Sequence, residues 1–334
     1  MKHFISTIEW TNAELAGLLD ETAELKAAKT RGGLEGKTMG MVFFNPSLRT
    51  RTSFEAGMFQ LGGHAINLEV GQGMWSLETA EGVVMDQAAA EHVKEAAPVL
   101  SRYVDVLAVR SFGAGRDWVV DREDPVIKSF ARYAEVPVIN MESSLWHPCQ
   151  ALADAFTWKE QGVAPGDRIA ITWAWHPKAL PHAVPNSALT VAAQLGLNVT
   201  VLRPEPFALD PDVMAGAADI AAQTGGSVTE TDDPGGLDGA RIVYAKSWGS
   251  LQAYGRPEEE SALREPFRDW QVTSEWMART DKARFMHCLP VRRNVVVSDE
   301  VLDSGASIVV DQAENRMHTQ NALLLRLLAS EESS

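Results

Sequence analysis

The sequence has very few cysteines and fewer positive than negative charges. Cys149 and Cys288 are the two cysteines among 334 residues, too few for a disulfide framework and compatible with a reducing cytosol. The formal net charge of −15 at pH 7 argues against a nucleic acid or an anionic membrane as a partner. Any site for a doubly charged phosphate must therefore gather its positive charge locally.

Long apolar runs and nucleotide-binding fingerprints are also missing. No apolar run approaches the length of a membrane span, and residues 1–6 lack the apolar core of a signal peptide. The strand-like segment ending at Trp173 is not followed by G-x-G-x-x-G, and the chain has no Walker A pattern. No His/Cys cluster has the spacing of metal ligands. We therefore expect a cytoplasmic protein that holds no metal, needs no cofactor and uses neither nicotinamide nor ATP chemistry.

Short apolar runs alternate with stretches of helical periodicity along the chain. The predicted strands are 38–44, 64–69, 104–109, 136–140, 167–173, 198–202, 227–229, 240–244 and 307–310. The predicted helices are 12–29, 48–61, 89–103, 124–133, 151–161, 186–195, 210–223 and 318–328. Such alternation is typical of α/β proteins with parallel sheets, and 334 residues that are 45% hydrophobic suffice for one large or two medium domains.

The turn between the first predicted strand and the second predicted helix is a candidate anion-binding site. Ser47 is placed to cap that helix, whose free backbone N–H groups and dipole favour a negative ligand. Arg49 and Arg51 add forked donors suited to phosphate oxygens. Considered alone, the segment could equally be a capped helix with two solvated arginines.

Residues 47–51 (Ser-Leu-Arg-Thr-Arg) resemble the Ser-Thr-Arg-Thr-Arg carbamoyl-phosphate motif of the aspartate/ornithine carbamoyltransferase family. Two further signatures of this family follow in the same order, His-Pro-Cys-Gln at 147–150 and His-Cys-Leu-Pro at 287–290, which leads into Arg292. The resemblance implies an α/β fold of two doubly wound parallel-sheet domains joined by crossing helices. The carbamoyl-phosphate-binding domain would span 1–145, completed by 314–334, and the acylornithine-binding domain 146–313. A homotrimer with shared active sites and a role in arginine biosynthesis are also implied.

The same resemblance assigns residues to carbamoyl phosphate. Its implied ligands are Ser47, Leu48, Arg49, Thr50, Arg110, His147, Gln150, Cys288, Leu289 and Arg316, with Trp75 contributed by a neighbouring subunit. The implied catalytic residues are Thr50, Arg110 and His147, which polarise the carbamoyl oxygen, and Gln150, which holds the carbamoyl NH₂. From its position alone, Arg110 follows a predicted strand where open α/β sheets bind ligands, although a surface salt bridge would explain it as well.

The segment Lys-Ser-Trp-Gly at 246–249 resembles the branch of the family that acts on N-acetylornithine, since ornithine-specific members usually carry Ser-Met-Gly there. Lys246 would repel the cationic α-amine of ornithine, whereas acylation leaves an α-carboxylate that a lysine can pair with. The glutamate at position 91 is a further resemblance to the acetyl-specific members. A carboxylate near the acyl tip would repel the distal carboxylate of a succinyl group. The other implied acceptor contacts are Glu142, His176, Leu289 and Arg292.

The implied reaction moves the carbamoyl group of carbamoyl phosphate to the δ-amine of N-acetyl-L-ornithine, giving N-acetyl-L-citrulline and phosphate. N-succinylornithine or ornithine as acceptor, and a catalytically silent homologue, stay open as alternatives. The Pro-rich segment 176–185 resembles the loop through which this branch forms a trefoil knot in its second domain. Val296 is a departure, since N-acetylornithine-specific relatives carry a lysine able to be carboxylated at this position.

Overall fold

The computed structural model describes residues 2–329, which form two compact units. Unit 1 comprises the described residues up to Ala114, then Val119–Cys149 and those from Arg316 onward; unit 2 comprises Gly115–Trp118 and Gln150–Asn315. Three boundaries fall inside helices, namely α4 (Trp118–Asp121), α6 (Pro148–Glu160) and α12 (Val309–Ala329), along which the chain passes from one unit to the other. The sequence-based boundaries of the carbamoyl-phosphate-binding domain (1–145 with 314–334) and the acylornithine-binding domain (146–313) stay a prediction. Residues 1 and 330–334 lie outside the described part.

Unit 1 is built on a parallel sheet whose strand order is β2-β1-β5-β6. Its strands are β1 (Thr38–Phe43), β2 (His64–Glu69), β5 (Val106–Arg110) and β6 (Val138–Glu142). The chain runs first from β1 to β2 at one edge and then returns to the other side of β1, so the order reverses between β1 and β5. Ligands bind at the carboxyl ends of strands beside such a reversal. Phe43 pairs with Arg110 in the register of this sheet, so both strands end at that point.

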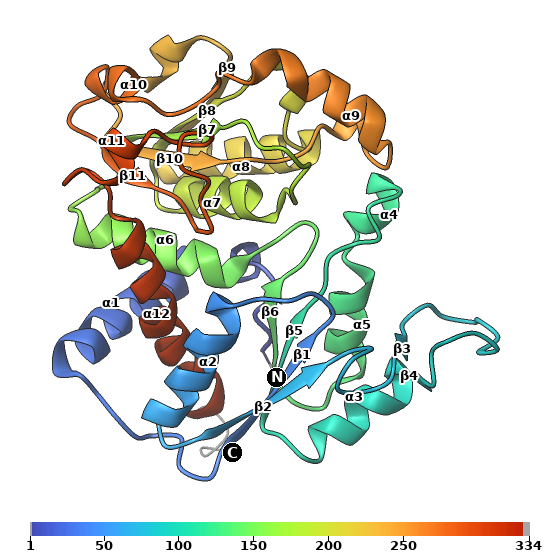
Figure 1. The fold of residues 1–334 in the computed structure, drawn as a ribbon. Coiled ribbons are helices and arrows are strands. Elements are labelled where there is room, and N and C mark those ends of the chain that lie inside the picture. Colours follow the sequence, from blue (N-terminus) through green and yellow to red (C-terminus); the bar gives the residue numbers. More distant parts are fainter. Residues whose placement is uncertain (1, 330–334) are drawn as a thin grey trace. The chain divides into compact units, whose positions relative to one another are not determined.

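The helices of unit 1 lie on both sides of this sheet. They are α1 (Asn12–Ala28), α2 (Arg49–Gln60), α3 (Val93–Ser101), α4 (Trp118–Asp121) and α5 (Pro125–Tyr133), with the second half of α12. Buried residues of α3 and α5 pack against Val42, Leu107 and Val138 of the strands. Figure 1 shows α1, α2 and α12 on the opposite side of the strands.

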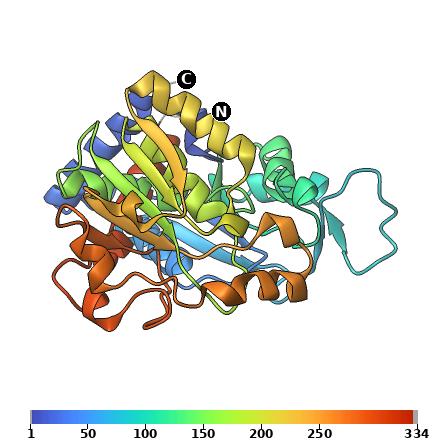
Figure 2. The ribbon, with the colours of Figure 1, turned by 90° about the horizontal axis from the view of Figure 1, so that it is seen from above.

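A long loop leaves unit 1 between two short parallel strands. These strands are β3 (Leu77–Glu78) and β4 (Glu91–His92), and residues 79–90 project away from the helices and strands of this unit in Figures 1 and 2. At the base of the loop, Glu81 accepts hydrogen bonds from Arg132 Nη1 at 2.7 Å and Lys94 Nζ at 3.2 Å. The loop is therefore anchored to α3 and α5 at its beginning.

Unit 2 contains a five-stranded parallel sheet with the order β11-β10-β7-β8-β9. Its strands are β7 (Arg168–Trp173), β8 (Asn198–Leu202), β9 (Ser227–Thr231), β10 (Ile242–Lys246) and β11 (Arg284–Met286). The strand order reverses between β7 and β10, whose last residues, Trp173 and Lys246, are paired in register. Lys246 thus ends a strand at the reversal point of its own sheet.

The helices of unit 2 complete a second α/β layer structure. They are the greater part of α6, then α7 (Ala183–Gln194), α8 (Pro211–Thr224), α9 (Pro257–Arg264), α10 (Ser274–Ala278), α11 (Asp299–Leu302) and the start of α12. Figure 2 shows α8 along one side of the strands. The other side is covered by segment 270–302, where Val296 and Val301 pack against Phe285 and Val243. The expected α/β fold with parallel sheets in two parts is confirmed.

Local signals located most elements correctly. Thr11 caps α1 in a capping box with Glu14, because each side chain satisfies a backbone N–H that the first turn leaves without a partner. The predicted strands at 64–69 and 198–202 are confirmed to the residue.

Among residues 2–329, no helix is both long and apolar enough to cross a membrane.

Some predictions were wrong. The predicted helix 89–103 is shorter, because Glu91 and His92 pair with β3 as a strand and α3 starts at Val93. The predicted strand 307–310 is a single bridge at Ser307 followed directly by α12, which begins nine residues before the predicted 318. Phe59 and Tyr103, two of the apolar residues in the predicted helices 48–61 and 89–103, are 79% and 70% exposed.

Candidate active site

The loop between β1 and α2 is fixed to the end of β5. Phe44 N donates to the carbonyl of Arg110 at 2.9 Å, and Asn45 Oδ1 accepts from Phe112 N at 2.8 Å. Ser47 Oγ accepts from Thr50 N at 3.3 Å, so it makes the expected contact with the first turn of α2. The N-cap position itself belongs to Leu48, contrary to the prediction for Ser47, and its side chain is 76% exposed.

Helix α12 brings Arg316 to the start of α2. Arg316 Nη2 donates to Thr50 Oγ1 at 3.2 Å, and its Nη1 lies 3.5 Å from His147 Nε2. The two helices approach closely at Gly57, where a Cβ atom would lie only 2.2 Å from Asn321 Oδ1. All three site side chains are more than nine-tenths buried. Arg316, which was predicted near the start of the last helix, therefore lies inside a longer helix, and its side chain contacts the start of α2 next to the predicted anion loop.

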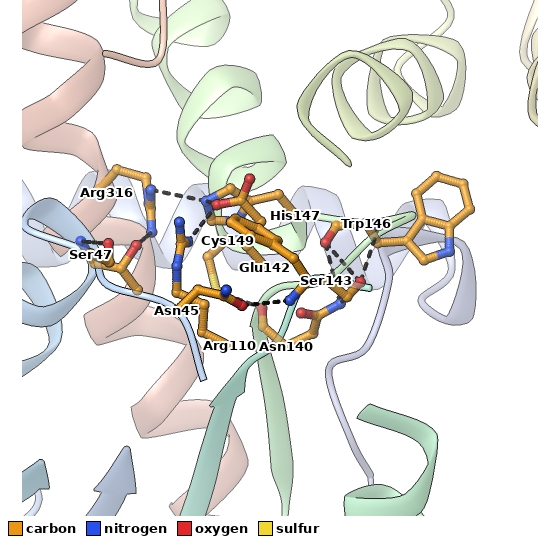
Figure 3. Close-up of polar contacts among 12 residues, drawn as sticks. Asn45, Ser47, Arg110, Asn140, Glu142, Ser143, Trp146, His147, Cys149 and Arg316 are labelled. Atoms are coloured by element: carbon orange, nitrogen blue, oxygen red, sulfur yellow. Dashed lines mark hydrogen bonds and ion pairs between the residues drawn. The ribbon is translucent and has the colours of Figure 1, made fainter. Parts of the chain in front are cut away.

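Arg110 and His147 share one carboxylate, that of Glu142. Arg110 Nη1 forms an ion pair with Glu142 Oε2, and the same oxygen lies 3.6 Å from His147 Nε2. Figure 3 shows Arg110, Glu142, His147 and Arg316 facing one another at the carboxyl ends of β5 and β6. Arg110 Nε is buried and has no hydrogen-bond partner among the residues that the structure describes. The cluster can therefore offer further donors to an anion that displaces or joins the carboxylate.

Not every cation of the motif is directed at this cluster. Arg51 pairs with Glu69 of β2 and stacks over Phe43, with its Cζ 5.2 Å from the ring centroid. An open cavity of about 430 Å³ lies beside this pair and the anion loop; its lining residues include Asn45, Ser47 and Leu48. Arg49 is half-buried. Arg51 thus contacts residues of β1 and β2 beside the loop. Nothing in the sequence predicts that Arg49 and Arg51 have different surroundings.

Trp75 and Glu91, predicted for different substrates, contact each other. Trp75 Nε1 donates to Glu91 Oε2 at 2.7 Å, across the base of the projecting loop. The indole is 58% exposed. Because Glu91 lies on β4, one residue before its end, the hydrogen bond ties the Trp75 loop to the β3–β4 pair.

In unit 2, the predicted acceptor residues His176, Lys246 and Arg292 form a cationic group. Arg292 Nε donates to His176 Nε2 at 3.0 Å, while Arg264 Nη1 donates to the His176 carbonyl at 2.7 Å. Burial, and then the charges of Arg292, Lys246 and Arg264, lower the pKa of His176 below its ordinary value. His176 is therefore neutral at pH 7 and accepts from Arg292. Such a group favours an anionic ligand such as a carboxylate.

Gln150 starts a buried network in unit 2 that the sequence did not predict. Gln150 Nε2 and Gln312 Nε2 both donate to Asp154 Oδ1, at 2.8 and 2.7 Å. Gln312 Oε1 accepts from His287 N at 3.0 Å, and His287 Nδ1 accepts from Leu289 N at 2.9 Å. The network links Gln150 to the backbone next to Cys288. A signal for Asp154 was available, because it lies four positions after Gln150 in an otherwise apolar helical run.

Val296, at which the sequence departs from the family pattern, lies in unit 2. Val296 is 1% exposed and belongs to the apolar core of unit 2, so this position is a packing position. Among residues 2–329, no group of three or more His, Cys, Asp or Glu side chains could hold a metal ion. The free Cys149 is buried, and burial raises the pKa of its thiol to about 12, which makes it unreactive at pH 7.

The chain is similar to known proteins over nearly its whole length. Residues 2–160 match the aspartate/ornithine carbamoyltransferase carbamoyl-P binding domain, and residues 167–327 match the Asp/Orn binding domain of the same family. N-acetylornithine carbamoyltransferase of Xanthomonas campestris pv. campestris is 47% identical over 333 residues, covering 98% of each chain. N-succinylornithine carbamoyltransferase of Bacteroides thetaiotaomicron is 37% identical over 294 residues, covering 87% of each.

Solved structures agree with these relatives. Acetylornithine transcarbamylase complexed with acetylcitrulline has a TM-score of 0.95 with this chain at 47% identity, covering 98% of this chain and 99% of that one. Together with the two domain matches, this likeness extends to both units and to all three motifs. The chain belongs to the aspartate/ornithine carbamoyltransferase family.

Proposed function

We propose that this protein transfers the carbamoyl group of carbamoyl phosphate to the δ-amine of N-acetyl-L-ornithine, giving N-acetyl-L-citrulline and phosphate, as a step of arginine biosynthesis. The observation that carries the proposal is the buried cluster of Thr50, Arg110, His147 and Arg316 around a helix start. In a chain of net charge −15, these groups concentrate positive charge at the carboxyl ends of β1 and β5. The resemblance to N-acetylornithine carbamoyltransferase supports the same activity.

The phosphate of the donor binds at the start of α2. The hydroxyl of Ser47, the backbone and side chain of Thr50 and the backbone of Leu48 donate to its oxygens, as helix N-termini do for other anions. Arg49, Arg110 and Arg316 neutralise its charge with forked donors that match phosphate geometry. The proposed site thus uses residues that are largely preorganised, since Thr50 already contacts Arg316.

The transfer needs no covalent intermediate with the protein. The neutral δ-amine attacks the carbonyl carbon, the bond from this carbon to the phosphate oxygen breaks, and the amine proton passes to the leaving phosphate. Arg110, Thr50 and His147 donate to the carbonyl oxygen as negative charge develops on it. Gln150 and the main-chain carbonyls near Cys288 and Leu289 accept from the carbamoyl NH₂. Proximity and electrostatic stabilisation supply the acceleration.

The acceptor binds through its charged ends. Lys246 and Arg292 pair with the α-carboxylate, and the neutral imidazole of His176 accepts a hydrogen bond from Arg292. Glu142 and the backbone at Leu289 position the rest of the molecule, and Glu91 disfavours a second carboxylate on the acyl group. Free ornithine would bring its α-ammonium close to Lys246, which is an unfavourable pair in a buried site.

A citrulline-forming assay tests this proposal. Purified protein would receive carbamoyl phosphate with ornithine, N-acetylornithine or N-succinylornithine in parallel reactions. We expect kcat/KM for N-acetylornithine to exceed that for the other two acceptors by at least about 100-fold, the range of two to three kcal/mol per discriminating contact. Turnover with N-succinylornithine alone would assign the other acyl group. No turnover with any acceptor, in a protein that binds carbamoyl phosphate, would leave a silent homologue.

Assembly and compartment complete the proposal. The protein acts in the cytoplasm as a homotrimer in which Trp75 closes on carbamoyl phosphate in a neighbouring subunit, and its second domain carries the trefoil knot of this branch around residues 176–185. If the sites are shared, mixing the inactive Trp75→Ala and Arg110→Ala proteins restores part of the activity, because some sites receive both intact residues. Mixing that restores nothing would contradict a role for Trp75 in trans.

A further inference from the structure

The short loop between β6 and α6 carries two of the proposed active-site residues at its ends, Glu142 and His147. Beneath this loop lies the carboxylate of Asp124, which is 5% exposed. Asp124 Oδ2 accepts from Ser143 Oγ at 2.6 Å, and its Oδ1 accepts from Ser144 N at 2.8 Å and from Leu145 N at 3.2 Å. One side chain therefore binds three consecutive residues of the loop.

Other contacts make this loop a rigid block. Asn140 Nδ2 donates to Ser143 Oγ at 2.9 Å, and Trp146 N donates to the same hydroxyl at 3.2 Å. Figure 3 shows Asn140, Ser143 and Trp146 gathered beside Glu142 and His147. On the far side, Ser144 Oγ accepts from Gly113 N at 2.6 Å, which ties the loop to the segment that follows Arg110. Asp124 is the charged group on which these contacts converge.

We propose that Asp124 is a positioning residue for carbamoyl transfer: its carboxylate fixes the loop 143–146 and thereby holds His147 and Glu142 in register with Arg110. This inference rests on the function proposed above. Asp124 touches neither substrate nor the reacting atoms, and it acts through the loop.

Asp124 combines a buried carboxylate with a left-handed backbone, both of which are energetically unfavourable. A packing role alone does not explain an aspartate at this position. Its backbone has φ 49 and ψ 51, a left-handed conformation that Asp and Asn tolerate better than other non-glycine residues. Although it occupies the N-cap of α5, its side chain makes no hydrogen bond to that helix. An ionised carboxylate can accept from all three loop donors at once, whereas an asparagine amide must direct its NH₂ at one side of the group.

The surroundings of Asp124 bear on its charge. Burial raises its pKa to about 6, against the lowering effects of the three hydrogen bonds and of Lys128. Lys128 lies one turn along α5 and also pairs with Glu123 at 2.8 Å, and Asp121 Oδ1 is occupied by Ala114 N. The carboxylate is thus ionised at pH 7, and acidification to pH 5 would remove an acceptor from beneath the loop.

The test compares Asp124→Asn with a matched control, Asp121→Asn. Asp121 is also buried, and its Oδ1 accepts from the backbone N–H of Ala114 at 2.9 Å. For Asp124→Asn we expect kcat to fall by roughly 10- to 100-fold, the effect of a small misplacement of catalytic groups. The dissociation constant for inorganic phosphate should change less than about threefold, because most of the proposed phosphate ligands lie outside loop 143–146. Asp121→Asn should keep kcat within about threefold of the wild type.

Two readouts separate positioning from a loss of folding. Below pH 6, log kcat of the wild type should fall with an additional slope that the Asp124→Asn protein lacks, since the variant already resembles the protonated form. The imidazole resonances of His147, assigned with a His147→Gln protein, should shift in Asp124→Asn and stay in place in Asp121→Asn. This second readout needs no acceptor, so it tests the positioning role even if the wild type transfers no carbamoyl group.

The outcomes are distinct. A wild type without turnover overturns the proposed function alone. If Asp124→Asn is folded, keeps the His147 resonances and has kcat within about threefold of the wild type, the positioning role is wrong. If the variant does not fold, Ser143→Ala replaces it: this change removes one donor to Asp124, and unchanged kcat and His147 resonances would again overturn the inference.

Discussion

Glu142 forms an ion pair with Arg110 while its carboxylate lies 3.6 Å from His147. Two groups that are expected to bind the carbamoyl donor are therefore held by a residue that is expected to bind the acceptor. In the chain without ligands, this carboxylate competes with any anion for Arg110. Removing its charge should weaken that competition.

We predict that Glu142→Gln binds carbamoyl phosphate more tightly, by roughly three- to tenfold, because one charge-assisted hydrogen bond no longer has to be exchanged. Turnover should fall at least about tenfold, since the acceptor loses a contact. Calorimetric titration with carbamoyl phosphate and a steady-state assay measure the two effects. Weaker donor binding by a stably folded variant would mean that Glu142 orients Arg110 instead of competing for it.

We predict that Thr50→Val lowers kcat/KM for carbamoyl phosphate by at least about tenfold, the effect of losing one good hydrogen bond to a charged group. The substitution keeps the branched shape but removes the hydroxyl that accepts from Arg316 at 3.2 Å. Thr52→Val is the matched control: its hydroxyl donates to the Leu48 carbonyl at 2.9 Å on the same helix. Equal losses in both variants would attribute the effect to α2 and not to the contact with Arg316.

We predict that Asp154→Asn costs about 1–3 kcal/mol of stability, the penalty for leaving buried polar groups poorly paired. Asp154 Oδ1 accepts from two amide donors, Gln150 and Gln312, and an asparagine cannot serve both with the same geometry. Because Gln312 also fixes His287 N, the KM for carbamoyl phosphate should rise as well. Urea unfolding and steady-state kinetics measure both effects, and a variant with unchanged unfolding would show that the network has rearranged without loss.

The strands and the sites at their ends could be predicted because their signals are local. Short buried runs mark β1, β5, β7 and β10, and the polar residues that follow a parallel strand lie at the ligand-binding edge of a sheet. Arg110 was identified from this rule and from the family motifs, and Lys246 from the family motifs. Lys246 was expected past its strand and is in fact the last residue of β10.

Contacts between distant segments could not be predicted. Asp124 has the sequence signal of a helix cap, Asp before Pro, yet its carboxylate is turned toward a loop twenty residues away. The start of α12 at Val309 was missed because Val309 and Val310 have the β-branched composition of a strand. In both cases tertiary packing selected one of two locally acceptable conformations.

We predict that Glu91→Gln lowers the preference for the acetylated over the succinylated acceptor by about tenfold, or 1.4 kcal/mol, through loss of charge repulsion. Glutamine retains an oxygen that can accept from Trp75 Nε1, so the 2.7 Å contact at the base of the loop is kept. The ratio of kcat/KM values for the two acceptors is the measurement. A Trp75→Phe protein, which loses the contact but keeps the charge of Glu91, is the control; a change of preference there alone would assign selectivity to the loop conformation.

Finally, we predict that Asp124 makes the stability of the protein depend on pH in the opposite sense to a salt-bridged carboxylate. Its pKa is about 6 in the folded chain against an ordinary value of 3.8, so between these pH values the folded protein binds more protons than the unfolded one. The free energy of unfolding therefore falls as the pH rises from 4 to 6, by on the order of 3 kcal/mol for a shift of about two pH units.

The Asp124→Asn protein lacks this titration. Its free energy of unfolding relative to the wild type should increase with pH over that window and level off above pH 7. Urea unfolding of both proteins at four pH values between 4 and 7.5 measures the difference, in which the titrations common to both cancel. A difference that is constant with pH would show that Asp124 is already ionised at pH 4. A variant that is more stable but slower at pH 7 would mean that the buried charge is kept for its effect on loop 143–146 and not for stability.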